Sequence, residues 1–225
     1  GMDSLALTDH GAMYGAIKFY LTALEFEMKP IIGLEAYMAA RSRFDKQANI
    51  DSDRYHLILL AKNETGYVNL MKLTTLSHLE GFYYKPRIDM EILRKYAEGL
   101  IVSSACLDGE ISQLLLQNRE KQAEEKAKEF LEIFGKDFYL ELQYHPKFEE
   151  YKKTNQGLIK LSEKLGIPLI ATNDVHYVEA EDAEAQDALL AVQTQKLISD
   201  KNRISMIGSP DFYLRSQEEM VEAFR

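Results

Sequence analysis

Aspartate and histidine side chains, which can bind metal ions, follow apolar runs at two distant places in this sequence. The first run ends in Asp9 and His10, and the second ends in Asp174 and His176. In α/β proteins with parallel strands, the loops after the strands converge at one end of the sheet, and sites form there. We therefore predict that the two stretches contribute to one metal-binding cluster. The alternative for each stretch is that the aspartate caps a helix and the histidine packs in the core.

Other side chains with ligating atoms lie in or beside further predicted strands. Glu35 stands in an apolar run, where a carboxylate needs a partner or a cation unless it faces solvent on an edge. Cys106 and His145 each end a predicted strand, whereas His56 begins one, so its position alone does not favour a ligand. Cys106 is a packed thiol, a nucleophile or a ligand. This mix of donors suits Zn, Mn or Fe, and two or three such ions would suit phosphoester hydrolysis.

The composition restricts the class of protein. The 225 residues carry a net charge of −9, which argues against non-specific nucleic-acid binding through a basic face. A single cysteine excludes an internal disulfide. The sequence has no apolar run of membrane-spanning length and no signal peptide, so we expect a soluble, cytoplasmic protein without a membrane partner. Neither glycine-rich phosphate-loop motif is present, which disfavours a Rossmann or P-loop nucleotide site.

Apolar runs alternate with helical patterns along most of the chain. The predicted strands cover residues 4–9, 31–38, 55–62, 99–106, 138–145 and 167–172. This alternation is typical of a parallel α/β sheet that forms either a barrel or an open doubly wound sheet.

Three further segments carry expectations of their own. In the helix predicted after residue 12, Ile17, Leu21, Leu24 and Met28 recur at three- and four-residue spacing, which predicts a buried stripe. The segment 41–54 is polar and lacks periodicity, so we expect it to be mobile. The segment 81–89 is aromatic and basic, so it could stack on a base, although such loops more often cover a core edge.

Five segments together resemble the polymerase and histidinol phosphatase (PHP) domain family. They are Leu7–Gly11 (LTDHG), Ile32–Glu35 (IGLE), His56–Ala61 (HLILLA), Gly81–Asp89 (GFYYKPRID) and Ala171–His176 (ATNDVH). Within the family they are most similar to the domain at the N-terminus of the bacterial DNA polymerase III alpha subunit. The segment 212–220 resembles the junction from that domain toward the polymerase palm.

The resemblance implies a fold and a metal site. The implied fold is a distorted (β/α)7 TIM-like barrel over residues 1–209, with residues 210–225 beginning the junction to the palm. The implied cofactors are up to three divalent ions, Zn, Mn or Fe. The metal ligands that carry over are His10, Glu35, His56, Cys106, Asp174 and His176, with His145 as a further candidate. The implied catalytic residues are Asp9, His10, Asp174 and His176, with Asp9 orienting its neighbour.

The resemblance also implies an activity and partners. The activity is metal-dependent 3′→5′ exonuclease proofreading, or structural support of synthesis, within a DNA-directed DNA polymerase, a nucleotidyltransferase. The partners are the primer 3′ end of DNA, the polymerase palm domain and other replisome subunits such as a separate proofreading subunit.

The sequence departs from the family pattern in one respect, and two alternative functions stay open. The family begins with a strand that carries an HxH motif and, shortly after it, an acid, and this sequence has neither. We therefore expect the first barrel strand to be missing, metal binding to be weak or incomplete, and nuclease activity to be low. The alternatives are a stand-alone PHP phosphatase acting on a small phosphoester and a non-catalytic interaction module. Segments 81–89 and 212–216 favour the polymerase domain over the phosphatase.

Overall fold

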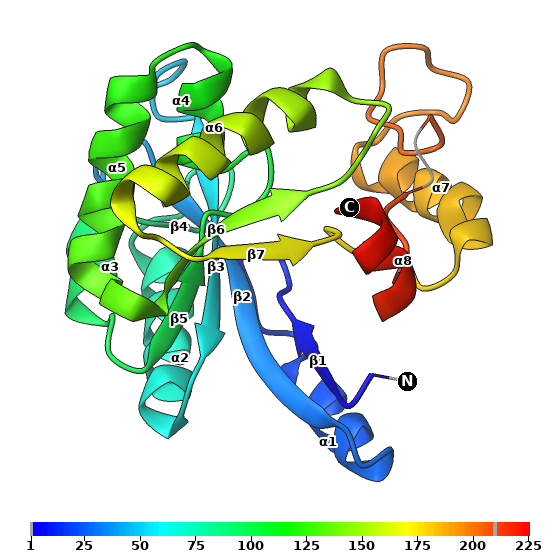
Figure 1. The fold of residues 1–225 in the computed structure, drawn as a ribbon, viewed down its shortest axis with the longest axis horizontal. Coiled ribbons are helices and arrows are strands. Elements are labelled where there is room, and N and C mark those ends of the chain that lie inside the picture. The colour runs from blue at the N-terminus through cyan, green and yellow to red at the C-terminus, as the bar shows by residue number, and fades with distance from the viewer. Residues whose placement is uncertain (1, 209–210) are drawn as a thin grey trace.

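The computed structural model describes residues 2–208 and 211–225, and within them seven strands form one curled sheet (Figure 1). The strands are β1 (Ser4–Leu7), β2 (Lys29–Ala39), β3 (Arg54–Ala61), β4 (Arg87–Ile88), β5 (Leu100–Ser103), β6 (Phe138–Gln143) and β7 (Leu169–Thr172). Their order is β1-β2-β3-β5-β6-β7, with β4 beside β2. The sheet curls like part of a barrel wall, which confirms the expected TIM-like α/β architecture.

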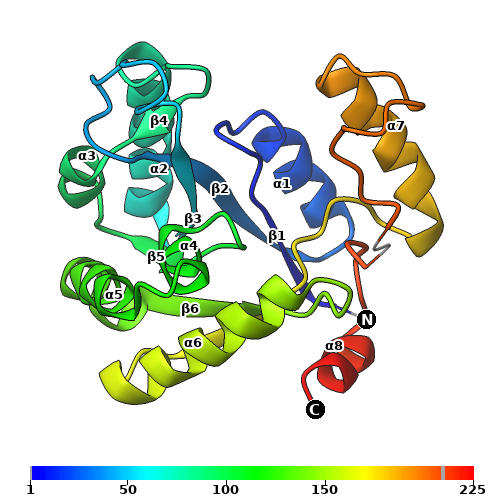
Figure 2. The same ribbon diagram turned by 90° about the horizontal axis from the view of Figure 1, so that it is seen from above.

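The described residues also form helices, most of which cover one face of this sheet (Figure 2). They are α1 (Ala16–Glu25), α2 (Glu64–Leu79), α3 (Met90–Lys95), α4 (Glu110–Leu116), α5 (Glu120–Phe134), α6 (Glu149–Leu165), α7 (Ala183–Gln193) and α8 (Gln217–Ala223), with single 3₁₀ turns at Gly135–Asp137 and Ala180–Asp182. Helices α2–α6 lie together, whereas α7 and α8 lie apart from them on the side of β1 (Figures 1 and 2). The main apolar core lies between the sheet and α2–α6, where Leu57, Leu59, Leu70 and Leu73 are fully buried.

The sheet is mixed, so the all-parallel arrangement expected from the sequence is wrong. β3 pairs antiparallel with both β2 and β5, whereas the pairs β1–β2, β5–β6 and β6–β7 are parallel. Residues 40–53 join β2 to β3 without an intervening helix, so the chain reverses direction there. Consequently the start of β3 lies at the same edge as the C-terminal ends of its neighbours. His56, near the start of β3, is thereby paired with Tyr37, near the end of β2.

Helix α1 packs through small side chains, and the buried stripe predicted for it is wrong. Ala16 and Ala23 are buried, whereas Ile17, Leu21 and Leu24 are 64%, 56% and 51% exposed. The regular spacing correctly indicates a helix, but the alanine side is the one that allows close approach to the sheet. The larger apolar side chains are left on the outer side of α1.

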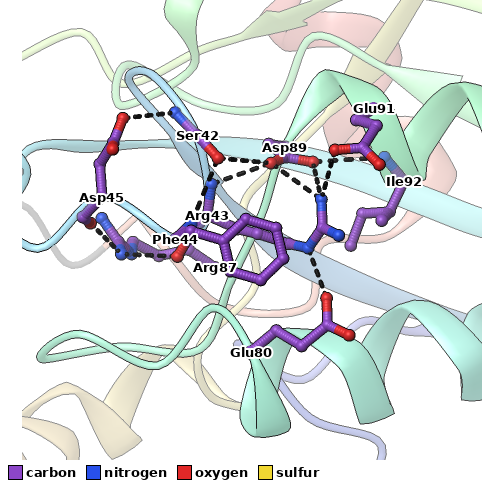
Figure 3. Close-up of polar contacts among 9 residues, drawn as sticks. All are labelled: Ser42, Arg43, Phe44, Asp45, Glu80, Arg87, Asp89, Glu91 and Ile92. Carbon is purple, nitrogen blue, oxygen red and sulfur yellow. Dashed lines mark hydrogen bonds and ion pairs between the residues drawn. The ribbon is translucent and has the colours of Figure 1, made fainter.

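The segment between β2 and β3 was expected to be mobile, but buried charges hold it in place. Arg43 is buried and forms ion pairs with Glu80, Asp89 and Glu91 (Figure 3). Asp89 also caps α3, since its side chain accepts a hydrogen bond from the N–H of Ile92. Arg87 is fully buried and donates to the main-chain carbonyls of Arg43, Asp45, Asp51 and Gly81. Two of the charged side chains in this segment, Arg43 and Asp51, are therefore paired inside the protein.

The end of the chain returns to the segment that follows β7. The expected domain boundary at residues 209 and 210 lies outside the described residues. Beyond it, the N–H of His176 donates to the carbonyl of Phe212 at 2.8 Å, and the Asn173 amide donates to the carbonyls of Asp211 and Tyr213, both at 2.7 Å. None of the helices in the described part of the chain is long and apolar enough to cross a membrane.

Candidate metal centre

Four of the predicted ligands converge where β1, β2 and β3 meet. Glu35 is buried in β2, so the alternative that it faces solvent is wrong. Its Oε1 lies 2.6 Å from Nδ1 of His56, and its Oε2 lies 3.4 Å from Nδ1 of His10. The Sγ of Cys106 lies 3.5 Å from Nδ1 of His56 and 4.0 Å from Oε1 of Glu35. Ligand atoms from His10, Glu35 and His56 all lie within 4.8 Å of one another.

Backbone hydrogen bonds extend the pairing of β1 and β2 as far as these ligands. The N–H of Glu35 donates to the carbonyl of Asp9 at 3.1 Å, and the N–H of Gly11 donates to the carbonyl of Glu35 at 2.8 Å. His10 is thereby held beside Glu35 in a parallel bridge. Gly11 has a φ of +64°, which turns the chain immediately after the ligand. A Cβ on Gly11 would lie only 2.8 Å from the Pro86 side chain, so this turn requires glycine.

Asp174 and His176 reach the same region from the end of β7. The ring centroid of His176 lies 6.0 Å from that of His10, and its Nδ1 lies 3.9 Å from Oδ1 of Asp174. Asp174 has a φ of +48°, so the two residues are not on an extended strand as the sequence pattern assumed. Burial raises the pKa of the Asp174 carboxyl well above its usual range, and the negative charges of Glu35 and Glu141 raise it further. One histidine from each Asp/His ending therefore lies beside the other, and the shared metal cluster stays a prediction.

Asp9 and His145 have other partners. The Asp9 carboxylate accepts a hydrogen bond from the N–H of Gly15 at 2.9 Å, at the start of α1. The buried His145 ring stacks on Phe212 with 4.0 Å between centroids and lies 4.6 Å from the ring of Tyr151. Neither of its nitrogens has a hydrogen-bond partner among the described residues, and burial lowers its pKa to about 4. A catalytic role for Asp9 and a ligand role for His145 stay predictions.

The protonation of the cluster is governed by burial and by its one central carboxylate. Burial alone would raise the pKa of Glu35, but the His56 hydrogen bond and the charge of His10 bring it below its usual value. Burial alone would lower the pKa of His56, but Glu35 raises it instead. Burial lowers the pKa of His10 despite Glu35, and burial raises the pKa of the Cys106 thiol well above its ordinary value. A divalent cation would favour the ligating form of each group, so this donor set fits a metal ion.

Sequence reasoning missed Asp108. Ligand atoms of His56, Cys106 and Asp108 lie within 4.8 Å of one another, which makes a second candidate group that shares His56 with the first. The carbonyl of Asp108 also accepts a hydrogen bond from the N–H of His56 at 2.9 Å. The available signal was an acid two residues after Cys106, the spacing that Asp174 and His176 have at the other predicted site.

Tyr37 was also missed, although it stands two residues after Glu35 and so on the same face of β2. Its ring lies nearly parallel to that of His10, with 13° between the planes and 6.1 Å between the centroids. It meets the His56 ring edge-on at 5.2 Å. Tyr37 therefore supports two candidate ligands from one side.

Comparisons with known proteins agree on a family. The family model described as the PHP domain matches residues 1–145. The chain is 53% identical over 224 residues to the DNA polymerase III subunit alpha of Borreliella burgdorferi, which covers 99% of this chain and 19% of that protein. The corresponding subunit of Treponema pallidum is 50% identical over 226 residues, and that of Thermus aquaticus is 48% identical over 219 residues. The chain thus spans about a fifth of the length of these relatives.

Proposed function

Because the chain belongs to the PHP domain family, we propose that it is the PHP domain of a bacterial replicative polymerase alpha subunit and a metal-dependent 3′→5′ exonuclease. The family match confirms the resemblance drawn from the five sequence segments. The observation that carries the proposal is the carboxylate of Glu35, which is buried among two imidazoles and a thiol that converge on it. Such a group is typical of a site that holds a cation.

The residues that would hold the ions come from both halves of the chain. They are His10, Glu35, His56, Cys106, Asp174 and His176, with Asp108 as an addition. Bound there, up to three Zn, Mn or Fe ions would stabilise the charge that develops on phosphate oxygens during hydrolysis. Glu35 orients the two imidazoles through their Nδ1 atoms, and Asp9 fixes the start of the helix that follows His10.

The proposal has consequences for the partners of the chain. The substrate would be the 3′ end of a primer, and the neighbours would be the polymerase palm and other replisome subunits such as a proofreading subunit. The protein would act in the cytoplasm, where bacterial chromosomes are copied. The relatives are all replicative polymerase subunits, which favours this reading over a stand-alone phosphatase that acts on a small phosphoester.

The proposal is tested by metal binding together with nuclease activity. Mn²⁺ or Zn²⁺ is titrated into the chelator-treated chain by calorimetry, and release of nucleotides from the 3′ end of a labelled oligonucleotide is then followed. We expect Glu35→Gln to weaken metal binding by at least ~100-fold, because a charged ligand is lost where even supporting groups are worth 10- to 100-fold. The same substitution should abolish the metal-dependent release.

The matched control is Glu132→Gln, which makes the same chemical change on the exposed side of α5 and should leave both measurements unaltered. Equal metal binding by the two variants would contradict the metal site. Turnover of a small phosphomonoester without any release from DNA would favour the phosphatase instead.

A further inference from the structure

We propose that Arg54 and Lys85, which both lie over the ring of Tyr37, form a phosphate-binding subsite beside the metal cluster. This subsite would bind a single-stranded nucleic acid. The inference rests on the proposed phosphodiesterase function and makes its substrate more specific. A subsite for a second phosphate group selects a polynucleotide and discriminates against a small phosphomonoester.

The ring of Tyr37 connects this subsite to the metal cluster. In the metal cluster, the ring centroids of His10 and His56 lie 6.1 and 5.2 Å from that of Tyr37. In the proposed subsite, the Nζ of Lys85 and the Cζ of Arg54 each lie 5.6 Å from the same Tyr37 centroid. Because the Tyr37 side chain is itself buried, it serves as a platform that holds the cations in place rather than as a surface for a base.

The two cations are not neutralised by the protein. Among the described residues, neither Arg54 nor Lys85 has a carboxylate within ion-pair distance. Arg54 donates from Nη1 to the carbonyl of Ser52 at 3.1 Å, but its buried Nε has no partner in the part of the chain described. A buried donor without a partner is costly, and a guanidinium with unused donors is suited to a phosphate group. By contrast, Arg43 and Arg87 are fully engaged within the protein.

Lys85 belongs to a loop that is fixed next to the metal site. The next residue, Pro86, packs against Gly11, which follows the ligand His10. The carbonyl of Lys85 accepts a hydrogen bond from the N–H of Tyr83 at 3.1 Å. At the end of the loop, Arg87 is locked among main-chain carbonyls. The lysine is therefore pre-positioned, unlike a lysine on a mobile surface loop.

Two aromatic side chains are exposed on the same loop. Phe82 is 51% exposed, and Tyr84 is 68% exposed with a φ of +59°, a backbone conformation that non-glycine residues adopt infrequently. Proteins that bind single-stranded nucleic acids usually combine exposed aromatic rings with nearby cations, because every base can stack on a ring. The chain as a whole carries a net charge of −9, so attraction of a nucleic acid depends on such a local arrangement.

The test measures binding of a fluorescent eight-residue oligothymidylate to the 225-residue chain by anisotropy, in EDTA and over a series of salt concentrations. We expect Lys85→Met and Arg54→Met each to weaken binding by about 10-fold. Each should also make the dependence of log K on log salt shallower by about 0.7, the contribution of one phosphate contact on a single strand. Thymidine monophosphate should compete poorly with the oligonucleotide.

The control is Lys152→Met, which removes an exposed lysine of α6 and should leave binding unchanged. A urea titration of each variant verifies folding, and Lys85→Met tests the idea alone if Arg54→Met does not fold. The subsite is overturned if the parent chain does not bind the oligonucleotide. It is also overturned if Lys85→Met binds with the same affinity and the same salt dependence as the parent chain. Because EDTA removes metal from this assay, its result is independent of the metal titration, in which equal metal binding by Glu35→Gln and Glu132→Gln would count against the proposed function.

Discussion

Two buried polar clusters of this protein differ in how completely their groups are satisfied. Around Arg43, one guanidinium is paired with three carboxylates, among them Glu80 at 2.7 Å and Asp89 at 3.0 Å (Figure 3). Around Glu35, the neighbouring imidazoles and thiol are all groups that can offer a lone pair, and among the described residues the only ion pairs of its carboxylate are with histidines. The first cluster is complete without a ligand, whereas the second has an excess of metal-ligating atoms. Burial of charge alone therefore does not mark a functional site, but a surplus of ligating atoms does.

The two clusters also differ in what they hold together. The Arg43 cluster and the neighbouring Arg87 connect residues 41–53 to the loop before β4 and to the start of α3. The Glu35 cluster draws on the ends of several strands, with members as far apart in sequence as His10 and Cys106. We expect substitutions in the first cluster to affect stability, and substitutions in the second to affect metal binding.

The largest expected effect is that of Arg87→Met. The substitution keeps much of the apolar stem but removes every guanidinium donor to the carbonyls of Arg43, Asp45, Asp51 and Gly81. Because buried carbonyls without partners are costly, we expect the free energy of unfolding to fall by about 3–5 kcal/mol in a urea titration. Arg94→Met, which removes a half-exposed guanidinium paired with Glu129, should cost under about 1 kcal/mol. Similar losses in both variants would contradict the structural role assigned to Arg87.

A smaller effect is expected from Asp89→Asn, which removes the ion pair with Arg43 together with the hydrogen bond that the carboxylate accepts from the N–H of Arg43. Asparagine caps helices about as well as aspartate, so the hydrogen bond from the N–H of Ile92 at 3.2 Å is retained. Arg43 keeps Glu80 and Glu91 as partners, so we expect a loss of about 2 kcal/mol rather than the full cost of a broken buried pair. The control is Glu91→Gln, because Glu91 is exposed and its pair with Arg43 should contribute little. An Asp89→Asn variant as stable as the parent would show that the pair is not stabilising.

The sequence predicted the TIM-like α/β architecture, whereas the metal site that it predicted stays a prediction. Ligand types at the ends of apolar runs were visible, and the His176 ring does lie 6.0 Å from that of His10. The strand pattern alone could not place His56 beside Glu35, because strand direction is set by the connection and not by the strand itself. Residues 40–53 return the chain without a helix, so β3 is antiparallel and its start lies at the site.

Partners distant in sequence explain the other errors. A charged segment such as 41–54 is mobile in isolation, and its order depends on Arg87 and Asp89, which come more than thirty residues later. The spacing of Ile17 and Leu21 indicates a helix but cannot tell which side faces the sheet, because alanines allow a closer approach than larger side chains. Asp108 and Tyr37 could have been found, since each stands two residues from a residue already chosen.

The smallest expected change in stability is that of Glu35→Gln in the absence of metal. The amide keeps the shape of the side chain and can still hydrogen-bond to His56, while the cost of burying a charge disappears. We therefore expect the free energy of unfolding in EDTA to change by less than about 1 kcal/mol. Asp89→Asn also replaces a carboxylate by an amide, yet it should cost more. With free metal at 100 times its dissociation constant, the parent should gain about 2.7 kcal/mol and the variant almost nothing. If Glu35→Gln in EDTA destabilises the protein as much as Asp89→Asn, Glu35 belongs with the structural cluster and the distinction between the two does not hold.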